Sequence, residues 1–339
     1  MFKYIITIKP LGMLYGSAGA FLSPENLVGR SGAKFPPDAA TVSGLFFSVN
    51  KHQEVADHEV LKYQLHVAGP FWARQDDPES FYVPIPRHRI IAKGDEDEWR
   101  LDDQRKWQRD SDPKKQALEA EYRWQRIDAW TKTTRKIRTD QEVEEIPWQY
   151  VSFLHPHMQA EQRHVLGKDG LFLESAVQMN EDACLIYLST HALPNGWYRF
   201  GGEGHVVEVA SQEIPSDSKI YQLLNTKIQR AFALIVPGVW GSKNLSYRYP
   251  KHPDFPREGI KMLTDKPVPY RYRIGHRATE RGRLGRGRYA VPAGTVYVLK
   301  RPLEKTWWEF PDEWFPKEGF PLKHLGCGLC LPVEVQGVA

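Results

Sequence analysis

Seven arginines lie within the eighteen residues from Arg271 to Arg288, and Glu280 is the single acidic residue among them. The arginines therefore cannot all be neutralised by their neighbours in sequence. Guanidinium groups bind phosphate, so a cluster of them on one segment favours contact with nucleic acid. Tyr270, Tyr272 and Tyr289 add aromatic faces on which unpaired RNA bases can stack. The run predicts either an RNA-binding loop or a solvated basic loop, and composition alone does not separate the two.

Two other glycine-rich segments could extend a basic surface. The first runs from Gly12 to Gly32 and leads into a predicted helix, and the N-terminus of a helix is a good phosphate site. An ordinary loop explains this segment equally well. The second, GWYRFGGEG at 196–204, places two aromatic residues and an arginine before a glycine cluster. Trp197, Tyr198 or Trp240 could stack a base, although Trp197 and Trp240 could also be core residues.

Glycines in the arginine run, Gly282, Gly285 and Gly287, would let a ligand approach the backbone closely. The residues that we assign to RNA binding are Arg30, Lys34, Tyr198, Arg199, Gly201, Gly202, Trp240, Lys243, Arg277, Arg281, Arg283, Arg286 and Arg288.

Cysteines and histidines offer weaker signals. Cys327 and Cys330 form a CxxC with His324 three residues before it, which raises the question of a zinc site. A structural zinc site usually has four ligands, and the sequence has no second such cluster, so we expect no metal. Twelve histidines could support acid–base cleavage of RNA, but none lies in a motif that combines a base, an orienting group and a nucleophile. We therefore expect no catalytic residues and no cofactor.

The composition is that of a soluble protein. The 339 residues carry a net charge of +4, and 41% of them are hydrophobic, which is enough for two compact units. The basic excess lies after residue 150. An odd number of cysteines, three, fits a reducing compartment. No segment approaches eighteen consecutive apolar residues, so we expect a cytoplasmic protein without a membrane contact.

The pattern of apolar residues predicts both strands and helices. FKYIITI at 2–8 reads as a first strand that Pro10 ends, and Val42, Leu45, Phe46 and Val49 have helical spacing. ACLIYLST at 183–190 and HVVEV at 205–209 read as a hairpin-like pair of strands. A helix over 218–230 and strands at AFALIVPG, TVYVL and LGCGLCLPVEV complete the C-terminal part.

Charged residues dominate from Lys93 to Glu145, and glycine almost disappears there. Asp112 and Pro113 resemble the start of a helix, after which an apolar stripe runs from Leu118 to Ile137. This segment therefore predicts a helical insertion with a solvated face. Trp107, Trp124 and Trp130 give it a possible docking surface for a partner.

Several phrases in order along the chain together resemble the RAMP superfamily of CRISPR-associated RNA-binding proteins. Within that superfamily they resemble the third subunit of type III-B Cmr effector complexes. The phrases are IITIKPLGMLYGSAGAFL, FPPDAATVSGLFF, WYRFGGEGHVVEV, ALIVPGVW, YAVPAGTVYVLK and LGCGLCLPV. The related handle-binding subunit of type III-D complexes has the same pattern of loops and stays open as an alternative.

The resemblance implies an α+β fold of two ferredoxin-like β-α-β-β-α-β units with glycine-rich loops and a charged helical insertion. We expect an N-terminal unit at 1–182, with the insertion at about 93–146, and a C-terminal unit at 183–339. The coarse pattern of strand, helix and strand in two blocks agrees with this division but could not single it out.

The resemblance also implies a function. A subunit of this kind binds the repeat-derived 5′ handle of the CRISPR RNA and caps the ribonucleoprotein used in antiviral defence. Its partners would be the large polymerase-like subunit, the first backbone RAMP subunit and, indirectly, target RNA. Two alternatives stay open: a metal-independent endoribonuclease that processes CRISPR RNA, and a scaffold that contacts only proteins, for which Trp307, Trp308, Trp314 and Phe315 would suit the surface.

Overall fold

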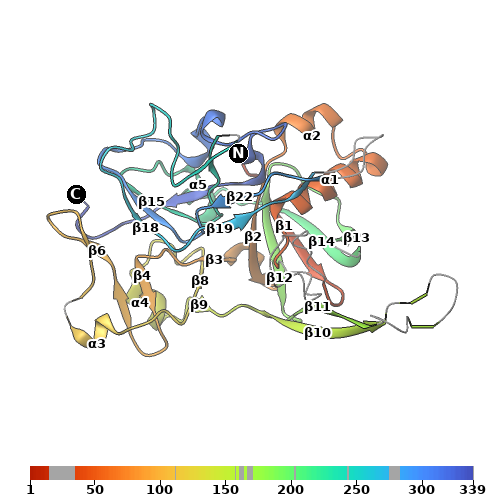
Figure 1. The fold of residues 1–339 in the computed structure, drawn as a ribbon, viewed down its shortest axis with the longest axis horizontal. Coiled ribbons are helices and arrows are strands. Elements are labelled where there is room, and N and C mark those ends of the chain that lie inside the picture. The colour runs from red at the N-terminus through yellow and green to blue at the C-terminus, as the bar shows by residue number, and fades with distance from the viewer. Residues whose placement is uncertain are drawn as a thin grey trace.

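The computed structural model describes residues 1–14, 35–110, 112–156, 158–159, 164–165, 171–201, 204–242, 244–274 and 283–338. Within them, the largest element is an antiparallel eight-stranded sheet (Figure 1). Its order is β13 (Gly196–Phe200), β14 (His205–Glu213), β1 (Tyr4–Pro10), β12 (Ala183–Ser189), β2 (Val67–Arg74), β3 (Tyr82–Pro84), β8 (Trp124–Arg126) and β9 (Val143–Glu144).

Helix α1 (Ala39–Gln53) covers one face of this first sheet. Val42, Leu45, Phe46 and Val49 recur at helical spacing and are buried, as the sequence predicts. They pack in one cluster with Ile6 of β1 and with the inward side chains of β12 and β14. The short helix α2 (His58–Gln64) follows and is capped by the Asp57 side chain, which accepts hydrogen bonds from two backbone amides.

A second, four-stranded antiparallel sheet forms the core of the C-terminal part. Its order is β18 (Lys261–Leu263), β23 (Val296–Val298), β15 (Ala231–Leu234) and β24 (Cys330–Pro332). Helix α5 (Lys219–Asn225) precedes it, with the Ser218 side chain as its cap. Phe232 and Tyr297 of this sheet share one core cluster with Ile5, Phe71 and Ile186, which lie on the face of the first sheet turned away from α1.

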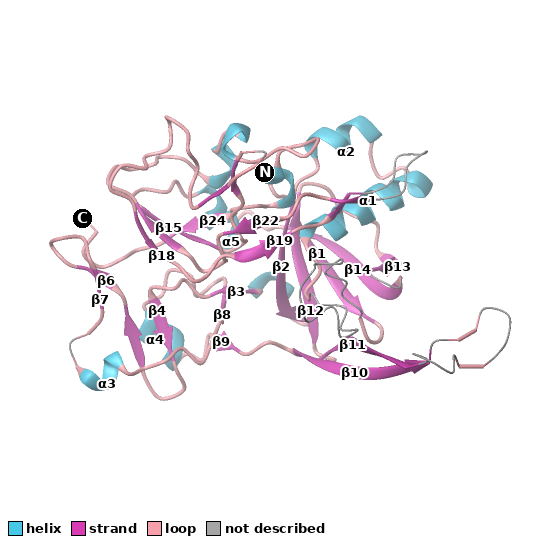
Figure 2. Ribbon diagram, viewed as in Figure 1, coloured by secondary structure: helices cyan, strands magenta, loops and turns pink. Residues whose placement is uncertain are grey.

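The two sheets share a strand order. Numbered by their sequence in the chain, β1, β2, β12 and β14 stand in the order 4-1-3-2, and β15, β18, β23 and β24 stand in the same order. All of these neighbours are antiparallel. The fold is thus a mixed α/β arrangement, built mostly of antiparallel sheet, as expected. Figure 2 shows how few helices accompany these strands.

A long two-stranded arm projects from the body of the molecule (Figure 1). It consists of β10 (Trp148–Pro156) and β11 (Leu171–Met179), paired along their full length. The sequence analysis did not predict it. The remaining elements are β4 (Arg89–Ile91), β5 (Glu96–Glu98), β6 (Arg100–Leu101), β7 (Trp107–Gln108), α3 (Pro113–Gln116), α4 (Thr134–Thr139), β16 (Trp240–Gly241), β17 (Ser246–Tyr247), β19 (Val268–Tyr270), β20 (Arg273–Ile274), β21 (Arg283–Leu284) and β22 (Arg288–Ala290).

The helical insertion predicted at 93–146 is wrong in its secondary structure. Asp112 does cap a helix, by accepting from the Lys114 amide at 2.9 Å, but that helix, α3, ends at Gln116. Short strands follow, and β8 and β9 extend the first sheet. Two of the three tryptophans predicted as a docking surface fix the insertion to the second sheet instead, whereas Trp124 packs edge-on against Trp148. Trp130 is buried and donates to the Pro332 carbonyl at 2.8 Å, and Trp107 donates to the Met262 carbonyl at 3.1 Å.

A further prediction about the first sheet needs correction. The strands at 183–190 and 205–209 exist, but they do not pair, because β1 lies between them. The partner of β14 in a hairpin is β13, formed by GWYRF. Residue 183, where the predicted C-terminal unit starts, begins β12, and β12, β13 and β14 all belong to the first sheet. The chain passes to the second sheet after Glu213.

The C-terminal glycine loop joins the two sheets. Gly326 and Gly328 both have φ of +67°, which favours glycine. A methyl group built on Gly326 would overlap Ala68 of β2, and one built on Gly328 would overlap the Trp240 ring. Trp240, 1% exposed, donates to the Tyr297 hydroxyl at 3.2 Å. The aromatic residues expected to serve a protein-facing scaffold, Trp307, Trp314 and Phe315, are likewise buried.

Candidate nucleic-acid interface

The arginine run forms a hairpin rather than a simple loop. Tyr270 of β19 pairs with Arg288 of β22, and farther out Arg273 of β20 pairs with Leu284 of β21. The Arg271 Nε donates to the Gly285 carbonyl at 2.7 Å across the same ladder. We call residues 268–274 and 283–290, the described part of this segment, the arginine hairpin. An antiparallel ladder fixes the direction in which its side chains leave the backbone.

A buried ion pair holds the base of the arginine hairpin. The Arg288 guanidinium lies 3.2 Å from the Glu318 carboxylate, and the two side chains are 3% and 10% exposed. Arg288 also donates to the Ser242 carbonyl at 2.9 Å. Arg288 is therefore a structural residue, and the prediction that it contacts RNA does not agree with its burial.

The tyrosines of the arginine hairpin divide by exposure. Tyr270 and Tyr272 are 9% and 7% exposed, so they belong to the core and not to a stacking surface. Burial, the Cys327 thiol and the Asp38 carboxylate raise the pKa of Tyr270, which places this tyrosine beside the start of α1. Tyr289 is 62% exposed and is the tyrosine of the three that a base can reach.

A turn between β16 and β17 supports the outer side of the arginine hairpin. Asn244 Oδ1 accepts from the Arg286 guanidinium at 2.5 Å, and the Ser246 hydroxyl accepts from the Tyr289 amide at 3.1 Å. Nearby, the Lys251 ammonium lies 4.3 Å from the centre of the Tyr247 ring. Cations and aromatic rings thus alternate around Arg286 and Tyr289, the combination that single-stranded nucleic acid favours. Asn244, Ser246 and Glu318 were not predicted to contact this hairpin, because no local pattern marks them.

Other predicted contact residues lie on the edge strand β13. Arg199 is exposed, whereas Tyr198 lies on the α1 face and donates to the Pro194 carbonyl at 2.7 Å. Trp197 is 73% exposed and is therefore the better stacking residue of the two. Gly201 has a φ of +77°, which a glycine adopts readily. Trp240 is a core residue, so it offers no surface to a base.

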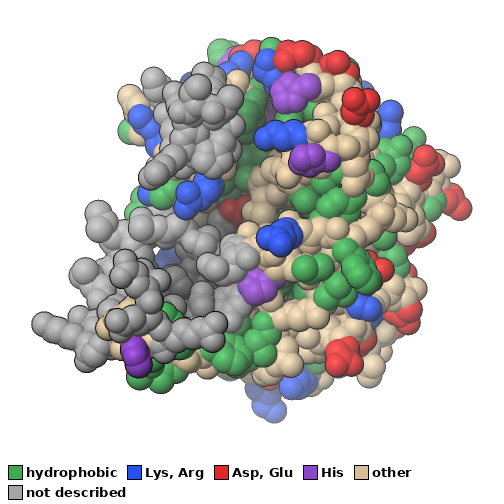
Figure 3. Space-filling view, turned by 90° about the vertical axis from the view of Figure 1, so that its right-hand side faces the viewer, with side chains coloured by type: hydrophobic (Ala, Val, Ile, Leu, Met, Phe, Trp, Pro, Cys, Tyr) green, Lys and Arg blue, Asp and Glu red, His purple; other side chains and the backbone are tan. Residues whose placement is uncertain are grey.

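Several predicted residues lie outside the described part of the chain. These are Arg30, Lys34, Gly202, Lys243, Arg277 and Arg281. For Arg283 the backbone pairing in β21 is described. On the side of the molecule that carries α1 and β13, Figure 3 shows Lys, Arg and His side chains across the middle and acidic side chains toward the top and right-hand edge.

The described histidines and cysteines are arranged for packing. Cys327 and Cys330 are buried, and the His324 ring lies against the His66 ring, tilted by 40°, with ring centres 4.1 Å apart. Among the described residues, no group of three or more His, Cys, Asp or Glu side chains could hold a metal ion. Burial lowers the pKa of His66 to about 3 and also lowers the pKa of His324, with Lys323 nearby adding to both effects.

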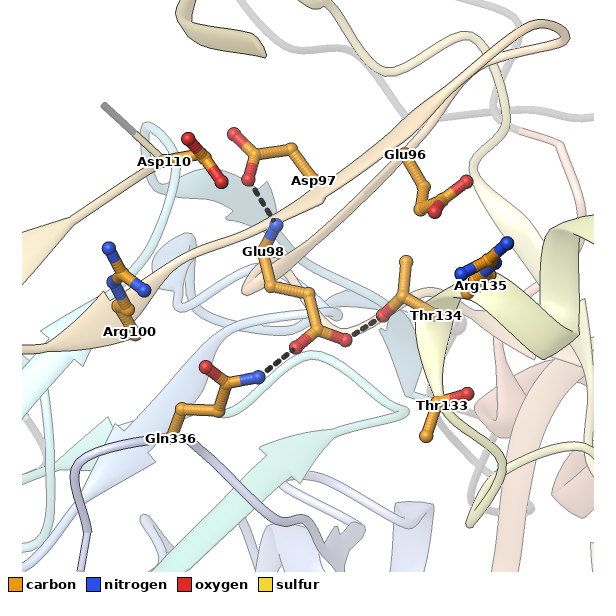
Figure 4. A pocket seen from close by; sticks show the side chains of 9 residues that line it. All are labelled: Glu96, Asp97, Glu98, Arg100, Asp110, Thr133, Thr134, Arg135 and Gln336. Carbon is orange, nitrogen blue, oxygen red and sulfur yellow. Dashed lines mark hydrogen bonds between the residues drawn. The ribbon is translucent and has the colours of Figure 1, made fainter. Parts of the chain in front are cut away.

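A pocket of about 270 Å³ lies in the insertion, and Figure 4 shows the side chains around it. Glu96, Asp97, Glu98 and Asp110 contribute carboxylates to its wall. Glu98 accepts hydrogen bonds from the Thr134 hydroxyl and, at 3.4 Å, from Gln336. Arg100 and Arg135 also line the pocket, but the carboxylates outnumber them, and an excess of negative charge disfavours phosphate.

A family profile described as "CRISPR-associated protein (Cas_Cmr3)" matches residues 20–334. The chain belongs to this family. The resemblance predicted from the sequence phrases is thereby confirmed for most of the length of the chain. A search of curated proteins finds no match. In the described part of the chain, no helix is both long enough and apolar enough to cross a membrane.

Solved structures show a more distant likeness to this Cas_Cmr3 protein. A chain from a type III-B Cmr-beta complex bound to cognate target RNA is 10% identical, with a TM-score of 0.48 and coverage of 87% of this chain and 86% of that chain. A chain from a Csm3–Csm4 subcomplex of the type III-A interference complex is 13% identical, with a TM-score of 0.40 and coverage of 98% and 99%. Because these TM-scores lie below 0.5, no functional argument rests on them.

Proposed function

We propose that this protein is a non-catalytic subunit of a type III CRISPR effector ribonucleoprotein and that it binds the repeat-derived 5′ handle of the CRISPR RNA. Membership of the Cas_Cmr3 family supports a type III effector subunit. The observation that carries the finer proposal is the arginine hairpin, which is anchored by a buried ion pair and presents further arginines and Tyr289 outside the core. The large polymerase-like subunit would lie beside it.

The chemistry of the arginine hairpin suits a single-stranded RNA end. Phosphate contacts fix the register of the strand, and stacking or base-edge contacts add recognition. Arg273 pairs with Leu284 in the ladder, and Arg286 lies between β21 and β22, where Asn244 orients its guanidinium. Because the anchor restricts the hairpin before RNA arrives, less conformational entropy is lost when RNA binds.

The projecting arm supports a role in assembly. Tyr150, Leu154 and Leu171 are 51%, 62% and 58% exposed. In the register of the arm, Leu171 pairs with Pro156, and Tyr150 and Leu154 lie on the same side of β10 as Pro156, so these three exposed residues share one face. An apolar face on a projecting hairpin is costly in water unless a partner covers it. We propose that the first backbone subunit covers it, which would bring target RNA into indirect contact.

We also propose that the two sheets are two ferredoxin-like units. A split β-α-β-β-α-β unit places its third strand between the first two and its fourth strand beside the first, which gives the order 4-1-3-2. Both sheets have this order. In this proposal α1 is the helix that connects β1 to β2 in the N-terminal unit, and β13 stands in place of a second helix between β12 and β14. In the C-terminal unit, irregular segments take the place of both helices.

The non-catalytic part of the proposal rests on the state of the histidines. A general acid or base works best with a pKa near the working pH. Burial lowers the pKa of His66 and of its neighbour His324, which disfavours the protonated form that a general acid needs. Purified protein incubated with repeat RNA, with and without divalent metal, should leave the RNA intact. Specific cleavage that is lost on replacing one histidine would favour the endoribonuclease alternative.

RNA binding is best tested by the salt dependence of handle affinity. For a single strand, the logarithm of the binding constant falls with the logarithm of salt by about 0.7 for each phosphate contacted. A variant with Arg283→Ala and Arg286→Ala should bind more weakly and lose about 1.4 from this slope. A variant with Arg135→Ala and Lys136→Ala, on α4 in the insertion, removes equal charge and should keep the slope. Equal slopes in both variants would place the RNA elsewhere.

A further inference from the structure

The first sheet has one face that is only partly covered. Ile5, Phe71 and Ile186, on the face turned away from α1, are fully buried against the second sheet. Toward the β14 and β13 edge the same face opens to solvent. Val206 of β14 is 46% exposed and Trp197 of β13 is 73% exposed.

The register of the strands sets out the side chains on this open edge. Lys9, Glu208 and Trp197 form one row across β1, β14 and β13. In the next row, Arg199 pairs with Val206, whose carbonyl accepts from the amide of Leu11. Leu11 is 49% exposed. We call these six residues the open edge. Trp197 and Arg199 stand about 6.8 Å apart along one side of β13, since each strand residue rises by about 3.4 Å.

The open edge is not explained by folding. Alternate residues of β13 and β14 point to the other face, where Val207, Val209 and Phe200 are buried beneath α1. Those residues stabilise the sheet, whereas Trp197 contributes little while its ring is mostly in water. An exposed tryptophan next to exposed Val206 and Leu11 forms an apolar patch that a ligand can cover.

We propose that the open edge is a second RNA-contact surface, in which Trp197 stacks one unpaired base and Arg199 binds a neighbouring phosphate. This inference rests on the proposed function, and it adds a base-stacking site that is separate in sequence from the arginine hairpin. Sheet faces that carry aromatic side chains are established platforms for single-stranded RNA. A cation on the same strand and side as the aromatic ring supplies the phosphate contact that stacking alone lacks.

Charge and area favour RNA over a protein at the open edge. Lys9 and Arg199 outnumber Glu208, so the surface is net positive. Its apolar part consists of one aromatic ring and two aliphatic side chains, which is small for a protein interface of about 800 Å² on each side. A single base over Trp197 needs no larger surface.

The test uses the full-length protein and a fluorescently labelled handle RNA. The variant Trp197→Ala should weaken RNA binding by about 5- to 100-fold, the usual effect of removing a stacking aromatic residue. Trp197→Phe should restore most of the affinity. Arg199→Gln should weaken binding and reduce the salt slope by about 0.7, whereas Trp197→Ala should leave the slope unchanged. Tyr63→Ala is the matched control, because Tyr63 on α2 is 63% exposed but lies outside the open edge.

A second arm of the test identifies the base. We use a set of handle RNAs that each lack one base. One abasic RNA should bind wild-type protein more weakly than the intact RNA does. The Trp197→Ala variant should bind this abasic RNA and the intact RNA with equal affinity. If Trp197→Ala binds RNA like wild type while Arg283→Ala with Arg286→Ala does not, the open edge contacts no RNA and the proposed function stands. If wild-type protein shows no salt-sensitive handle binding, both proposals fail. If Trp197→Ala keeps RNA affinity but loses a co-purifying subunit, the open edge is a protein interface.

Discussion

The buried pair between Arg288 and Glu318 allows a sharp prediction about stability. Replacing Glu318 by alanine leaves the Arg288 guanidinium, 3% exposed, without its counter-charge. Removing one partner of a buried ion pair typically costs about 3–5 kcal/mol. Arg288 keeps its hydrogen bond to the Ser242 carbonyl, so we expect the lower end, about 3 kcal/mol. That is a large share of the roughly 5–15 kcal/mol by which proteins are stable.

Equilibrium unfolding in urea, followed by circular dichroism, measures this loss. The urea concentration at the unfolding midpoint should be lower for Glu318→Ala than for wild type. The slope of the unfolding free energy against urea concentration should stay the same, because the surface exposed on unfolding hardly changes. Glu258→Ala is the matched control. Glu258 lies 3.7 Å from Lys300, and these side chains are 76% and 60% exposed. An exposed pair of this kind contributes at most about 1 kcal/mol.

The double variant completes the cycle. Arg288→Met with Glu318→Leu removes both charges and should recover most of the lost stability, since apolar replacements of a buried pair are often neutral or better. If Glu318→Ala destabilises the protein no more than Glu258→Ala does, the pair does not anchor the arginine hairpin, and our reasoning about the hairpin base is wrong.

Two further predictions follow from the packing. Burial lowers the pKa of His66 from 6.5 to about 3. Between these pH values His66 is protonated in the unfolded chain but not in the folded chain. The free energy of unfolding therefore falls as the pH falls from 6.5 toward 3. Between pH 7.5 and pH 5, urea unfolding of His66→Phe should show about 2 kcal/mol less loss of stability than wild type shows. The same pH profile in both proteins would contradict this. Gly328→Ala should destabilise the protein by about 2–4 kcal/mol, because the added methyl group would overlap Trp240 and the backbone has a positive φ there. Gly287 has open space around it. Gly287→Ala should therefore change stability by less than about 1 kcal/mol in the same assay.

The elements with clear periodicity could be predicted from sequence. β1, β12 and α1 alternate or repeat apolar residues in the pattern that their buried faces require, and Ser218 caps α5. The apolar stripe from Leu118 to Ile137 does not form one helix, because it combines core contacts of a short strand, turns and α4. Burial in such a segment depends on the second sheet, which local sequence does not encode.

The candidate site shows a similar division. The excess of arginine in 271–288 is visible in the sequence, but the choice between anchor and ligand contact is not. Arg288 meets Glu318, thirty residues later, and Arg286 meets Asn244, forty-two residues earlier. Trp197 and Tyr198 look equivalent until the strand alternation places one in solvent and the other beneath α1. Such outcomes depend on tertiary pairing and not on residue type.

The central claim is that this Cas_Cmr3 protein holds the handle of the CRISPR RNA through its arginine hairpin. The most direct measurement is the affinity of the purified protein for handle RNA and for a scrambled RNA of equal length across a series of salt concentrations. We expect tighter binding to the handle, a steep loss of affinity with salt, and a shallower slope in the variant with Arg283→Ala and Arg286→Ala. Binding that ignores salt, or that survives unchanged in this variant, would contradict the claim.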